Sequence, residues 1–456
     1  MLVRIIDLPL PAQVVLQLHF MPDNRSVLAL SDDGSVVMLS AVDGDCKAVL
    51  EVSCTNKVLG STTPFCFPSL SACCSTADVD FRAMIARVRP HREGAGLTVS
   101  ALQKIAILGG DGIGPEVIRE AKLLLELLRD KGGVPLEFLD LDLGADRYLR
   151  DGTTFPKEIA EQIRTDCRAV LLGALGDPRV PGLEHARDIL FGMRFGYDLF
   201  ANVRPVRVLS DRLVPLKGRL AKDIDLVVFR ENTEGVYVGF GGQFKKGTPD
   251  EIGINEDVNT RKGVERIIRA AFTWADQHGK KRVCMADKSN AMKFAHELWL
   301  RTFQEVAKEY PGIEARHVYV DALCLFLIQD PTQFDVVVTN NLFGDIVTDL
   351  GAALQGGLGM AASANVHGSD TSRVALFEPV HGSAPPLAGK DLANPFASFL
   401  TVGMMMTHLG HDKLVGLIEA CVTEALDAHQ CTRDVGGDLG TRAAAAFVRE
   451  RVAARL

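Results

Sequence analysis

Short apolar runs alternate with longer amphipathic stretches from residue 104 to the end of the chain. Each short run is typical of a buried strand, and the amphipathic stretches repeat their apolar positions about every three to four residues, as helices do. The predicted strands cover residues 104–108, 134–140, 169–173, 226–229, 282–286 and 334–339. The predicted helices cover residues 117–131, 156–164, 261–278 and 291–310, and one more begins near Phe343. This alternation predicts an α/β fold in which helices cover the sheet.

A glycine-rich run, GGDGIG, joins the first of these strands to the first helix at Gly109–Gly114. Pro115 near the start of that helix and Gly132 after its end follow the usual distribution of these residues at helix termini. The glycine spacing differs from G-x-G-x-x-G, and no acidic residue convincingly ends the second strand. A Rossmann-type dinucleotide site is therefore not predicted here.

The segment before residue 101 has a different pattern. Two β-type runs in residues 21–41 flank Ser31–Gly34, whose Ser-Asp-Asp-Gly sequence favours a hairpin turn. This segment resembles one blade of a β-propeller, yet no second copy follows at the spacing of about 40–45 residues that a propeller needs. Residues 60–100 are rich in Ser, Cys, Thr and Pro and lack a clear period. We predict that residues 1–100 form a weakly structured extension, either disordered or a short β-hairpin; a small accessory module is the alternative.

Charge and composition narrow the class of partner. The 456 residues include 50 basic and 58 acidic side chains, a formal net charge of −8, which disfavours nucleic acid as a partner. No run approaches the roughly 18 consecutive apolar residues of a membrane-spanning helix, so no membrane partner is expected. The cysteines lack zinc-site spacing, and those after residue 100 are interpreted as reduced thiols. Because residues 1–20 make a poor signal peptide, we expect a cytoplasmic protein.

Two carboxylates follow the strand at 334–339. Asp345 and Asp349 are four residues apart, so a helix places both on one face. Paired carboxylates suit a hard divalent ion such as Mg²⁺ or Mn²⁺. The alternative interpretation is a solvent-exposed helix face with acidic residues near its start.

Several basic residues also follow apolar or small-residue stretches. Arg194, Arg204 and Arg230 each offer a guanidinium fork, and a substrate with two carboxylates needs several such forks. Lys288 directly follows a strand, where partial burial or a cationic neighbour lets a lysine act as a base. Tyr237 could give or take a proton in a closed site. Surface ion pairs, a solvated loop lysine and a packed tyrosine are the alternatives.

The segment Phe377–Pro395, FEPVHGSAPPLAGKDLANP, is rich in Gly, Pro and Ala and has neither a helical nor a strand period. We expect a loop whose backbone amides wrap a planar ligand. A featureless connection is the alternative.

From about Lys104 onward the chain resembles the isocitrate/isopropylmalate family of β-decarboxylating 2-hydroxy-acid dehydrogenases. The motifs that carry the resemblance stand in family order: GGDGIGPEV, ANVRPV, RENTEG, ADKSNAM, YVDA, TNNLFGDIVTDL and FEPVHGSAP…ANP. The resemblance implies the family's two-domain α/β fold, which is not a Rossmann fold. Residues 101–199 and 356–456 would form the nucleotide-binding domain, and residues 200–355 the substrate, metal and dimerisation domain.

The resemblance also implies roles for individual residues. Tyr237 and Lys288 look like the catalytic pair. The substrate-binding positions would be Arg194, Arg204, Arg230 and Asp321, with Leu190 and Phe191 beside the variable group. The divalent-metal ligands would be Asp321, Asp345 and Asp349. The NAD-binding positions would be Glu378, His381, Gly382, Ser383, Ala384, Pro385 and Asn394. The family implies a homodimer in which the neighbouring subunit donates the Lys288 and Asp321 positions to a shared site.

The residues before Arg194 bear on the substrate. Leu190 and Phe191 form an apolar patch that suits an isopropyl group, while Asp188 would repel a third carboxylate. The expected reaction is therefore NAD- and metal-dependent oxidative decarboxylation of 3-isopropylmalate to 4-methyl-2-oxopentanoate, in leucine biosynthesis; burial of the patch in the helix core is the alternative. The sequence GDPRVP at residues 176–181 is more similar to tartrate/D-malate enzymes, which are therefore an alternative. A homoisocitrate-type activity is a further alternative.

Two further alternatives concern the coenzyme and catalysis itself. Pro386 stands where NAD-using relatives carry an aspartate, which leaves NADP open, although no replacement for a 2′-phosphate site is evident. A non-catalytic regulatory subunit on the same fold is disfavoured, because such subunits lose metal ligands or the Tyr/Lys pair and this chain keeps them.

Overall fold

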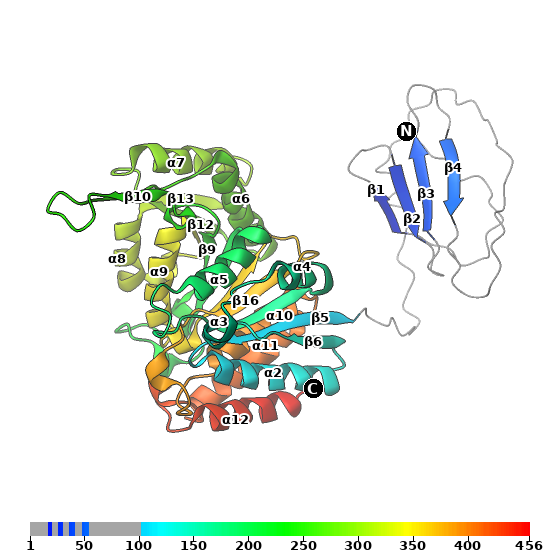
Figure 1. Ribbon diagram of the computed structural model, residues 1–456, viewed down its shortest axis with the longest axis vertical. Helices are drawn as coiled ribbons and strands as arrows, with labels where there is room; N and C mark the ends of the chain where they lie inside the picture. Colours follow the sequence, from blue (N-terminus) through cyan, green and yellow to red (C-terminus); the bar gives the residue numbers. More distant parts are fainter. Residues whose placement is uncertain (1–16, 21–25, 31–35, 42–47, 54–101) are drawn as a thin grey trace. The chain divides into compact units, whose positions relative to one another are not determined.

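The computed structural model describes residues 17–20, 26–30, 36–41, 48–53 and 102–456. The chain divides into two units, residues 1–98 and 99–456. In the first unit, four strands form an antiparallel sheet in chain order (Figure 1): β1 (Gln17–Phe20), β2 (Ser26–Leu30), β3 (Val36–Ala41) and β4 (Ala48–Ser53). The pairing of β2 with β3 agrees with the hairpin expected there. The expectations for residues 54–100 lie outside the described residues.

A mixed sheet of ten strands organises the second unit, in the order β13-β12-β14-β9-β8-β15-β16-β7-β5-β6. Its strands are β5 (Gln103–Gly110), β6 (Leu136–Asp140), β7 (Ala169–Ala174), β8 (Ala201–Arg207), β9 (Asp225–Glu231), β12 (Arg282–Asp287), β13 (Glu314–Tyr319), β14 (Val336–Thr339), β15 (Ala362–Val366) and β16 (Ala375–Pro379). Strands β13, β12, β14 and β9 are parallel, as are β16, β7, β5 and β6. Between them, β8 and β15 pair antiparallel with each other and with their outer neighbours. The two parallel blocks therefore run in opposite directions, which a Rossmann sheet does not do.

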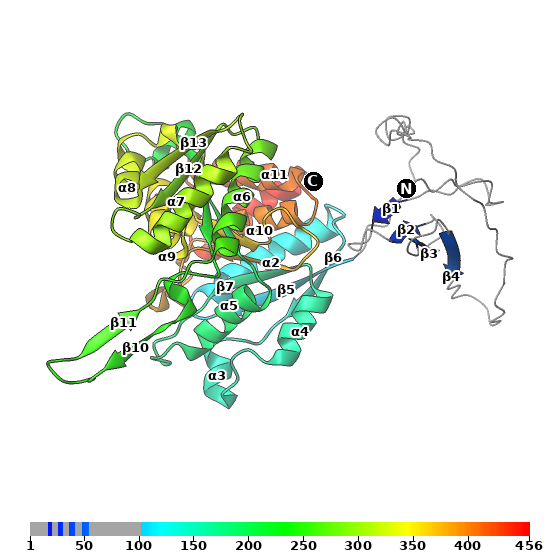
Figure 2. The same cartoon turned by 90° about the horizontal axis from the view of Figure 1, so that it is seen from above.

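Helices cover both faces of this sheet (Figures 1 and 2). They are α2 (Gly114–Asp130), α3 (Ala145–Asp151), α4 (Lys157–Asp166), α5 (Glu184–Gly196), α6 (Arg261–Gln277), α7 (Lys293–Ala307), α8 (Val320–Gln329), α9 (Asn341–Leu354), α10 (Phe396–His408), α11 (Lys413–Asp427) and α12 (Thr441–Ala453). The α/β fold expected from the strand–helix alternation is confirmed.

Alternating side chains of the strands supply three cores. On one face, residues such as Val227 and Phe229 of β9 join a single large core with α2, α6, α7, α10, α11 and α12. On the other face, Leu226 and Val228 join a core with α8 and α9, while a separate core lies under α4 and α5. The second face is therefore covered in two blocks, and polar residues occupy the middle strands β8 and β15 between them.

One local expectation needs correction, and one helix start is now defined more closely. Phe377–Pro379 belong to β16, so the segment Phe377–Pro395 was wrongly expected to contain no strand; its first residues pair with β15 and β7. Helix α9 begins at Asn341, two residues before Phe343, because the Asn340 side chain accepts a hydrogen bond from the Phe343 amide (2.9 Å) and caps the helix.

A two-stranded hairpin, β10 (Gly241–Phe244) with β11 (Ile252–Asn255), projects from the second unit (Figure 2). It carries exposed apolar side chains, among them Phe244, Ile252 and Ile254. The sequence pattern did not predict this hairpin. Of the helices in the described ranges, none is long and apolar enough to cross a bilayer.

The core gives a matched stability test. Phe272 of α6 is fully buried and packs on Phe303 and Tyr310, with ring centroids 5.5 and 5.0 Å away, whereas Phe294 of α7 is 95% exposed. We expect Phe272→Ala to lower the free energy of unfolding by about 3–5 kcal/mol, because it leaves a cavity. Phe294→Ala is expected to change it by less than about 0.5 kcal/mol. Urea unfolding followed by circular dichroism measures both; similar losses would contradict the described packing.

Candidate active site

Two buried arginines lie side by side on the middle strands of the second face. Arg204 of β8 and Arg230 of β9 are 6% and 2% exposed. Both point to the face that also carries Leu226 and Val228, because they keep the same strand alternation. Burial of charged groups at this point of the sheet requires partners, and polar side chains from the neighbouring elements supply them.

Asp345 of α9 is the carboxylate that the two arginines share. Its Oδ1 lies 2.5 Å from Arg230 Nη1 and 3.3 Å from Arg204 Nη1, and its Oδ2 accepts a hydrogen bond from the Tyr237 hydroxyl (2.9 Å). Burial opposes ionisation of this carboxyl, but the Arg230 and Arg204 charges prevail and lower the pKa of Asp345. Burial, together with the nearby Arg204 and Arg194 charges, lowers the pKa of Arg230 to about 9.

Amide and hydroxyl oxygens hold the remaining guanidinium nitrogens. Arg230 donates from Nε and Nη2 to Asn341 Oδ1 (3.0 and 2.7 Å). Arg204 donates from Nε to Asn202 Oδ1 and from Nη1 to Thr348 Oγ1, both at 2.6 Å. These uncharged partners orient the two guanidinium groups without neutralising their positive charge. The sequence analysis missed Asn202, Asn341 and Thr348, although all three stand in motifs it quoted; uncharged side chains gave no separate signal.

A third arginine reaches the same place from the flanking helix. Arg194, in the last turn of α5, is 5% exposed and donates to Glu378 Oε1 of β16 (2.8 Å). Its Nε is buried without a hydrogen-bond partner. Glu378 was expected among the NAD-binding residues; the structure places it against a predicted substrate arginine. Three guanidinium groups thus gather beside Asp345 and Glu378, an arrangement that suits a ligand with carboxylates.

Aromatic side chains border the arginines. Tyr237 lies in a 3₁₀ turn, with its ring 5.3 Å from the Arg230 guanidinium, and Phe191 of α5 meets that ring edge-on at 6.2 Å. Burial and the Asp345 charge raise the pKa of Tyr237, which keeps its proton on the hydroxyl. Leu190 instead packs partly against the core under α4 and α5. Of the expected apolar patch, Phe191 thus lies beside Tyr237 while Leu190 contributes to the helix core.

Asp349 follows Asp345 one turn along α9. Burial and the negative charge of Asp345 raise the pKa of Asp349. The two carboxylates therefore repel each other, as those of a cation site do before a cation binds. Within residues 102–456, no group of three His, Cys, Asp or Glu side chains is close enough together to hold a metal ion.

Lys288 and Asp321 form a separate pair. Lys288 follows β12, Asp321 lies in the first turn of α8, and Nζ and Oδ1 are 2.5 Å apart. The hydrogen bond from Lys288 lowers the pKa of Asp321, whose side chain is 66% exposed. In residues 102–456, no hydrogen bond or ion pair joins this pair to the three arginines.

The expected nucleotide loop packs on the glycine-rich run. Ser383 accepts a hydrogen bond from the Ile113 amide (2.8 Å), and a Cβ at Gly112, whose φ is +58°, would lie 2.0 Å from the Ser383 carbonyl oxygen. Glycine is therefore required there by close approach to the loop. His381 is buried, which lowers its pKa, and its Nε2 has no hydrogen-bond partner.

The remaining expected nucleotide-binding positions of this segment have different local conformations and contacts. Gly382 follows His381, Ala384 adopts a left-handed conformation (φ +39°), and Pro385 starts a 3₁₀ turn, Pro385–Leu387. Asn394 is engaged locally: it donates to Asp434 Oδ2 (3.0 Å) and accepts from the Phe396 amide (2.9 Å).

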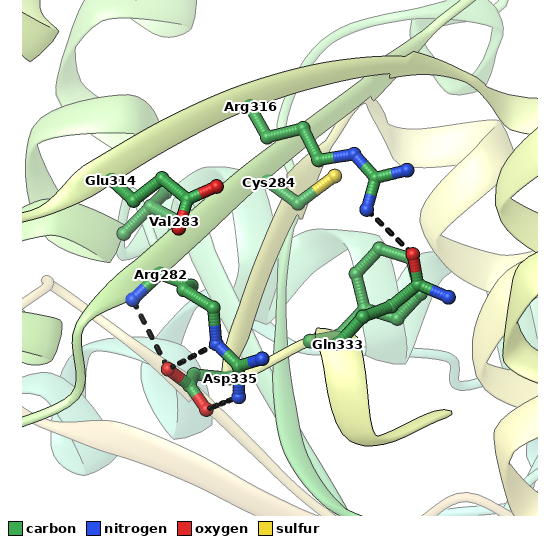
Figure 3. A pocket seen from close by; sticks show the side chains of 8 residues that line it. Arg282, Val283, Cys284, Glu314, Arg316, Gln333 and Asp335 are labelled. Atoms are coloured by element: carbon green, nitrogen blue, oxygen red, sulfur yellow. Dashed lines mark hydrogen bonds and ion pairs between the residues drawn. The ribbon is translucent and has the colours of Figure 1, made fainter. Parts of the chain in front are cut away.

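A small cavity of about 150 Å³ lies at the opposite ends of β12 and β13 from Lys288 and Asp321 (Figure 3). Arg282 pairs there with Asp335 (2.7 Å), and Arg316 donates to Gln333 Oε1 (2.6 Å). Because the carboxylates Glu314 and Asp335 also line this cavity and match its two arginines in number, it is a weaker anion site than the arginine cluster.

Comparison with known proteins identifies the family. The isocitrate/isopropylmalate dehydrogenase family matches residues 104–450. A 3-isopropylmalate dehydrogenase of Thermobifida fusca (strain YX) is 42% identical over 347 residues, 75% of this chain and 98% of that protein. The corresponding protein of Frankia casuarinae is 44% identical over 348 residues, 75% of this chain and 99% of its own length.

Solved structures agree. The crystal structure of isocitrate dehydrogenase from Methylococcus capsulatus superposes with a TM-score of 0.69 at 38% identity, covering 77% of this chain and 99% of that one. The TT0538 protein from Thermus thermophilus gives a TM-score of 0.68 at 37% identity, covering 76% of this chain and 68% of that one. Fold, motifs and relatives coincide, and the chain is an enzyme of the isocitrate/isopropylmalate dehydrogenase family.

Proposed function

We propose that the chain catalyses NAD- and metal-dependent oxidative decarboxylation of 3-isopropylmalate to 4-methyl-2-oxopentanoate, a step of leucine biosynthesis. The observation that carries this proposal is the gathering of three buried guanidinium groups beside an aromatic pair, Phe191 and Tyr237. A malate with an apolar substituent offers two carboxylates for the arginines and a hydrocarbon group for the aromatic rings. Relatives named 3-isopropylmalate dehydrogenase support the same assignment.

The metal ligands would be Asp345 and Asp349, with Asp321 supplied by a second copy of the chain. The donor set fits Mg²⁺ or Mn²⁺, because all three are carboxylates and the first two already repel each other. The ion would draw electron density from the substrate's hydroxyl oxygen and adjacent carboxylate, favouring loss of the hydroxyl proton.

NAD would lie against the loop His381–Pro385, near Glu378 and Asn394. The unpaired, buried Nε2 of His381 fits a polar group of a ligand, because a buried nitrogen without a partner is costly. NAD would accept the hydride from the substrate's carbinol carbon. Pro386 cannot accept a hydrogen bond through its side chain from a ribose hydroxyl, so the coenzyme is tested with NADP in parallel.

The chain's own residues would move two protons. Lys288, in its neutral form, accepts the proton of the substrate's hydroxyl group. After CO₂ has left, Tyr237 donates its phenolic proton to the carbon that carried the carboxylate. The raised pKa of Tyr237 suits this role, since the hydroxyl keeps its proton until that step.

A homodimer would complete the site. The pair Lys288–Asp321 stands apart from the arginines within one chain, so a second copy is needed to bring a lysine to each arginine cluster. Exposed apolar side chains on the β10–β11 hairpin and on α8, where Leu325 is 53% exposed, offer surface for that contact. The unpaired thiols of the described part of the chain support a reducing, cytoplasmic location.

The first test is a spectrophotometric assay at the NADH absorbance band with Mn²⁺ present. We expect 3-isopropylmalate with NAD to give the highest kcat/KM among 3-isopropylmalate, D-malate, tartrate, isocitrate and homoisocitrate, and EDTA to abolish turnover. The similarity to an isocitrate dehydrogenase structure makes isocitrate the sharpest competitor. A preference for isocitrate, D-malate or tartrate would reassign the substrate while keeping the family.

The proton acceptor is tested by Lys288→Ala. We expect kcat to fall by about 10²–10⁴-fold, the usual contribution of a general base, while KM stays within a few-fold because the arginines are intact. Lys262→Ala, at an exposed position of α6, is the matched control and should retain turnover. Retained turnover in Lys288→Ala would remove this residue from the base role.

Substrate selection is tested by Phe191→Ala. Loss of the ring beside Tyr237 removes apolar contact, so kcat/KM for 3-isopropylmalate should fall by about 10- to 200-fold, the discrimination expected of a small hydrophobic pocket. The value for D-malate should change far less. Phe195→Ala, whose residue stacks on Phe191 but is 40% exposed, serves as control. Equal losses with both substrates would contradict a role of Phe191 in selection.

A further inference from the structure

A fully buried histidine lies directly beneath Lys288. His296, in the first turns of α7, accepts a hydrogen bond at Nδ1 from the Lys288 backbone amide (2.8 Å). A ring nitrogen that accepts from an N–H group carries no proton, so the proton of the neutral imidazole is on Nε2. The contact fixes the backbone of Lys288, not its side chain.

The other side of the ring faces the start of α9. His296 Nε2, which carries the proton, lies 3.5 Å from Asp257 Oδ2; Asn340 Nδ2, itself a donor, lies 3.3 Å away and packs against the ring without a hydrogen bond. Asn340 is the residue that caps α9, and the ring of Phe343 meets the histidine edge-on at 5.4 Å. His296 therefore hydrogen-bonds the Lys288 backbone on one side and packs against Asn340 and Phe343, at the start of α9, on the other.

Lys288 is held by contacts of different kinds. Its carbonyl oxygen accepts hydrogen bonds from the amides of Ala291 and Met292 (2.9 and 2.8 Å), and its Nζ pairs with Asp321. The preceding residue, Asp287, is anchored by His317 (2.8 Å). The hydrogen bond to His296 holds the Lys288 amide, so both the amide and the carbonyl group of this residue are fixed.

We propose that His296 is a positioning residue that sets the location of the Lys288 ammonium group through this backbone hydrogen bond. The proposal rests on the proposed role of Lys288 as proton acceptor. A base must stand within hydrogen-bond reach of the proton it takes, and a displacement of about 1 Å can cost about 10²-fold in rate. The substrate arginines do not touch His296, so the substrate's own binding is left intact.

Two substitutions of His296 test the Nδ1 side and the Nε2 side of its ring separately. In His296→Asn, the amide oxygen occupies the place of Nδ1 and keeps the acceptor for Lys288. In His296→Gln, the longer amide reaches the place of Nε2 and loses that acceptor. We expect kcat to fall by less than about threefold in the first and by about 10- to 100-fold in the second, with KM within about twofold in both.

A second readout does not depend on turnover. Competitive labelling of lysines with acetic anhydride, read by mass spectrometry, reports how well the ion pair with Asp321 protects the Lys288 amine. Labelling of Lys288 should be faster in His296→Gln than in His296→Asn or the unmodified chain, while Lys262 labels equally in all three. Equal labelling and equal kcat losses in the two variants would overturn the proposal, because a merely structural histidine predicts no difference.

The two readouts also separate this proposal from the proposed function. If no hydroxy acid is oxidised, the proposed function fails, but the labelling difference still decides the role of His296. If either variant fails to fold, Asp257→Asn leaves the ring in place and weakens only its Nε2 side. Because the Nδ1 contact to Lys288 is kept, kcat should stay within about threefold and Lys288 labelling should match the unmodified chain; a tenfold loss of kcat or faster labelling would overturn the positioning role.

Discussion

The burial of three guanidinium groups on one patch of the sheet is the constraint on which the site depends. Removing an ion from water costs several kcal/mol, and Arg194, Arg204 and Arg230 repel one another as well. Asp345 offsets this cost for two of them and Glu378 for the third. Amide and hydroxyl oxygens satisfy other nitrogens without adding negative charge. The three forks are thereby held in place, which suits a small substrate with two carboxylates.

The sheet provides a place for that patch. The middle strands present apolar residues to the large core on one face and polar residues to the other. On this second face the helices are divided into two blocks, α4 with α5 and α8 with α9, each over its own core. Arg194 comes from one block and Asp345 from the other, so the helices meet over β8 and β15 through polar contacts instead of a third apolar core.

Much of the fold could be predicted from the sequence because its strands are short, buried and separated by strongly periodic helices. The strand at 282–286 and the helix at 261–278 agree with β12 and α6 to within a residue. The antiparallel pairing of β8 with β15 could not be predicted, since it joins segments far apart in sequence. The strand at Phe377–Pro379 was missed for a related reason. Its partner strands are remote in the sequence, and because it contains the charged Glu378 and a proline, it shows no alternation of apolar and polar residues.

Site residues with a charged or reactive side chain could be predicted from the sequence. Residues that contribute only through their position in the fold could not. Arg194, Arg204, Arg230, Tyr237 and Asp345 meet in one place, and their motifs indicated them. Asn202, Asn341 and His296 were missed because an amide or a single histidine resembles ordinary core or capping chemistry until its partner is known. The sequence also contains no signal that Leu190 and Phe191, adjacent on α5, face different surroundings; only helix rotation decides that.

The separation of Lys288 and Asp321 from the arginines has a physical consequence. In one chain, Asp321 is largely exposed, so its ion pair with Lys288 is screened by water. In the proposed homodimer, docking against the arginine cluster of a second copy would remove that water from around the pair. In that homodimer, catalytic competence would belong to the assembled pair, with His296 holding the backbone of the lysine that each copy supplies to the other.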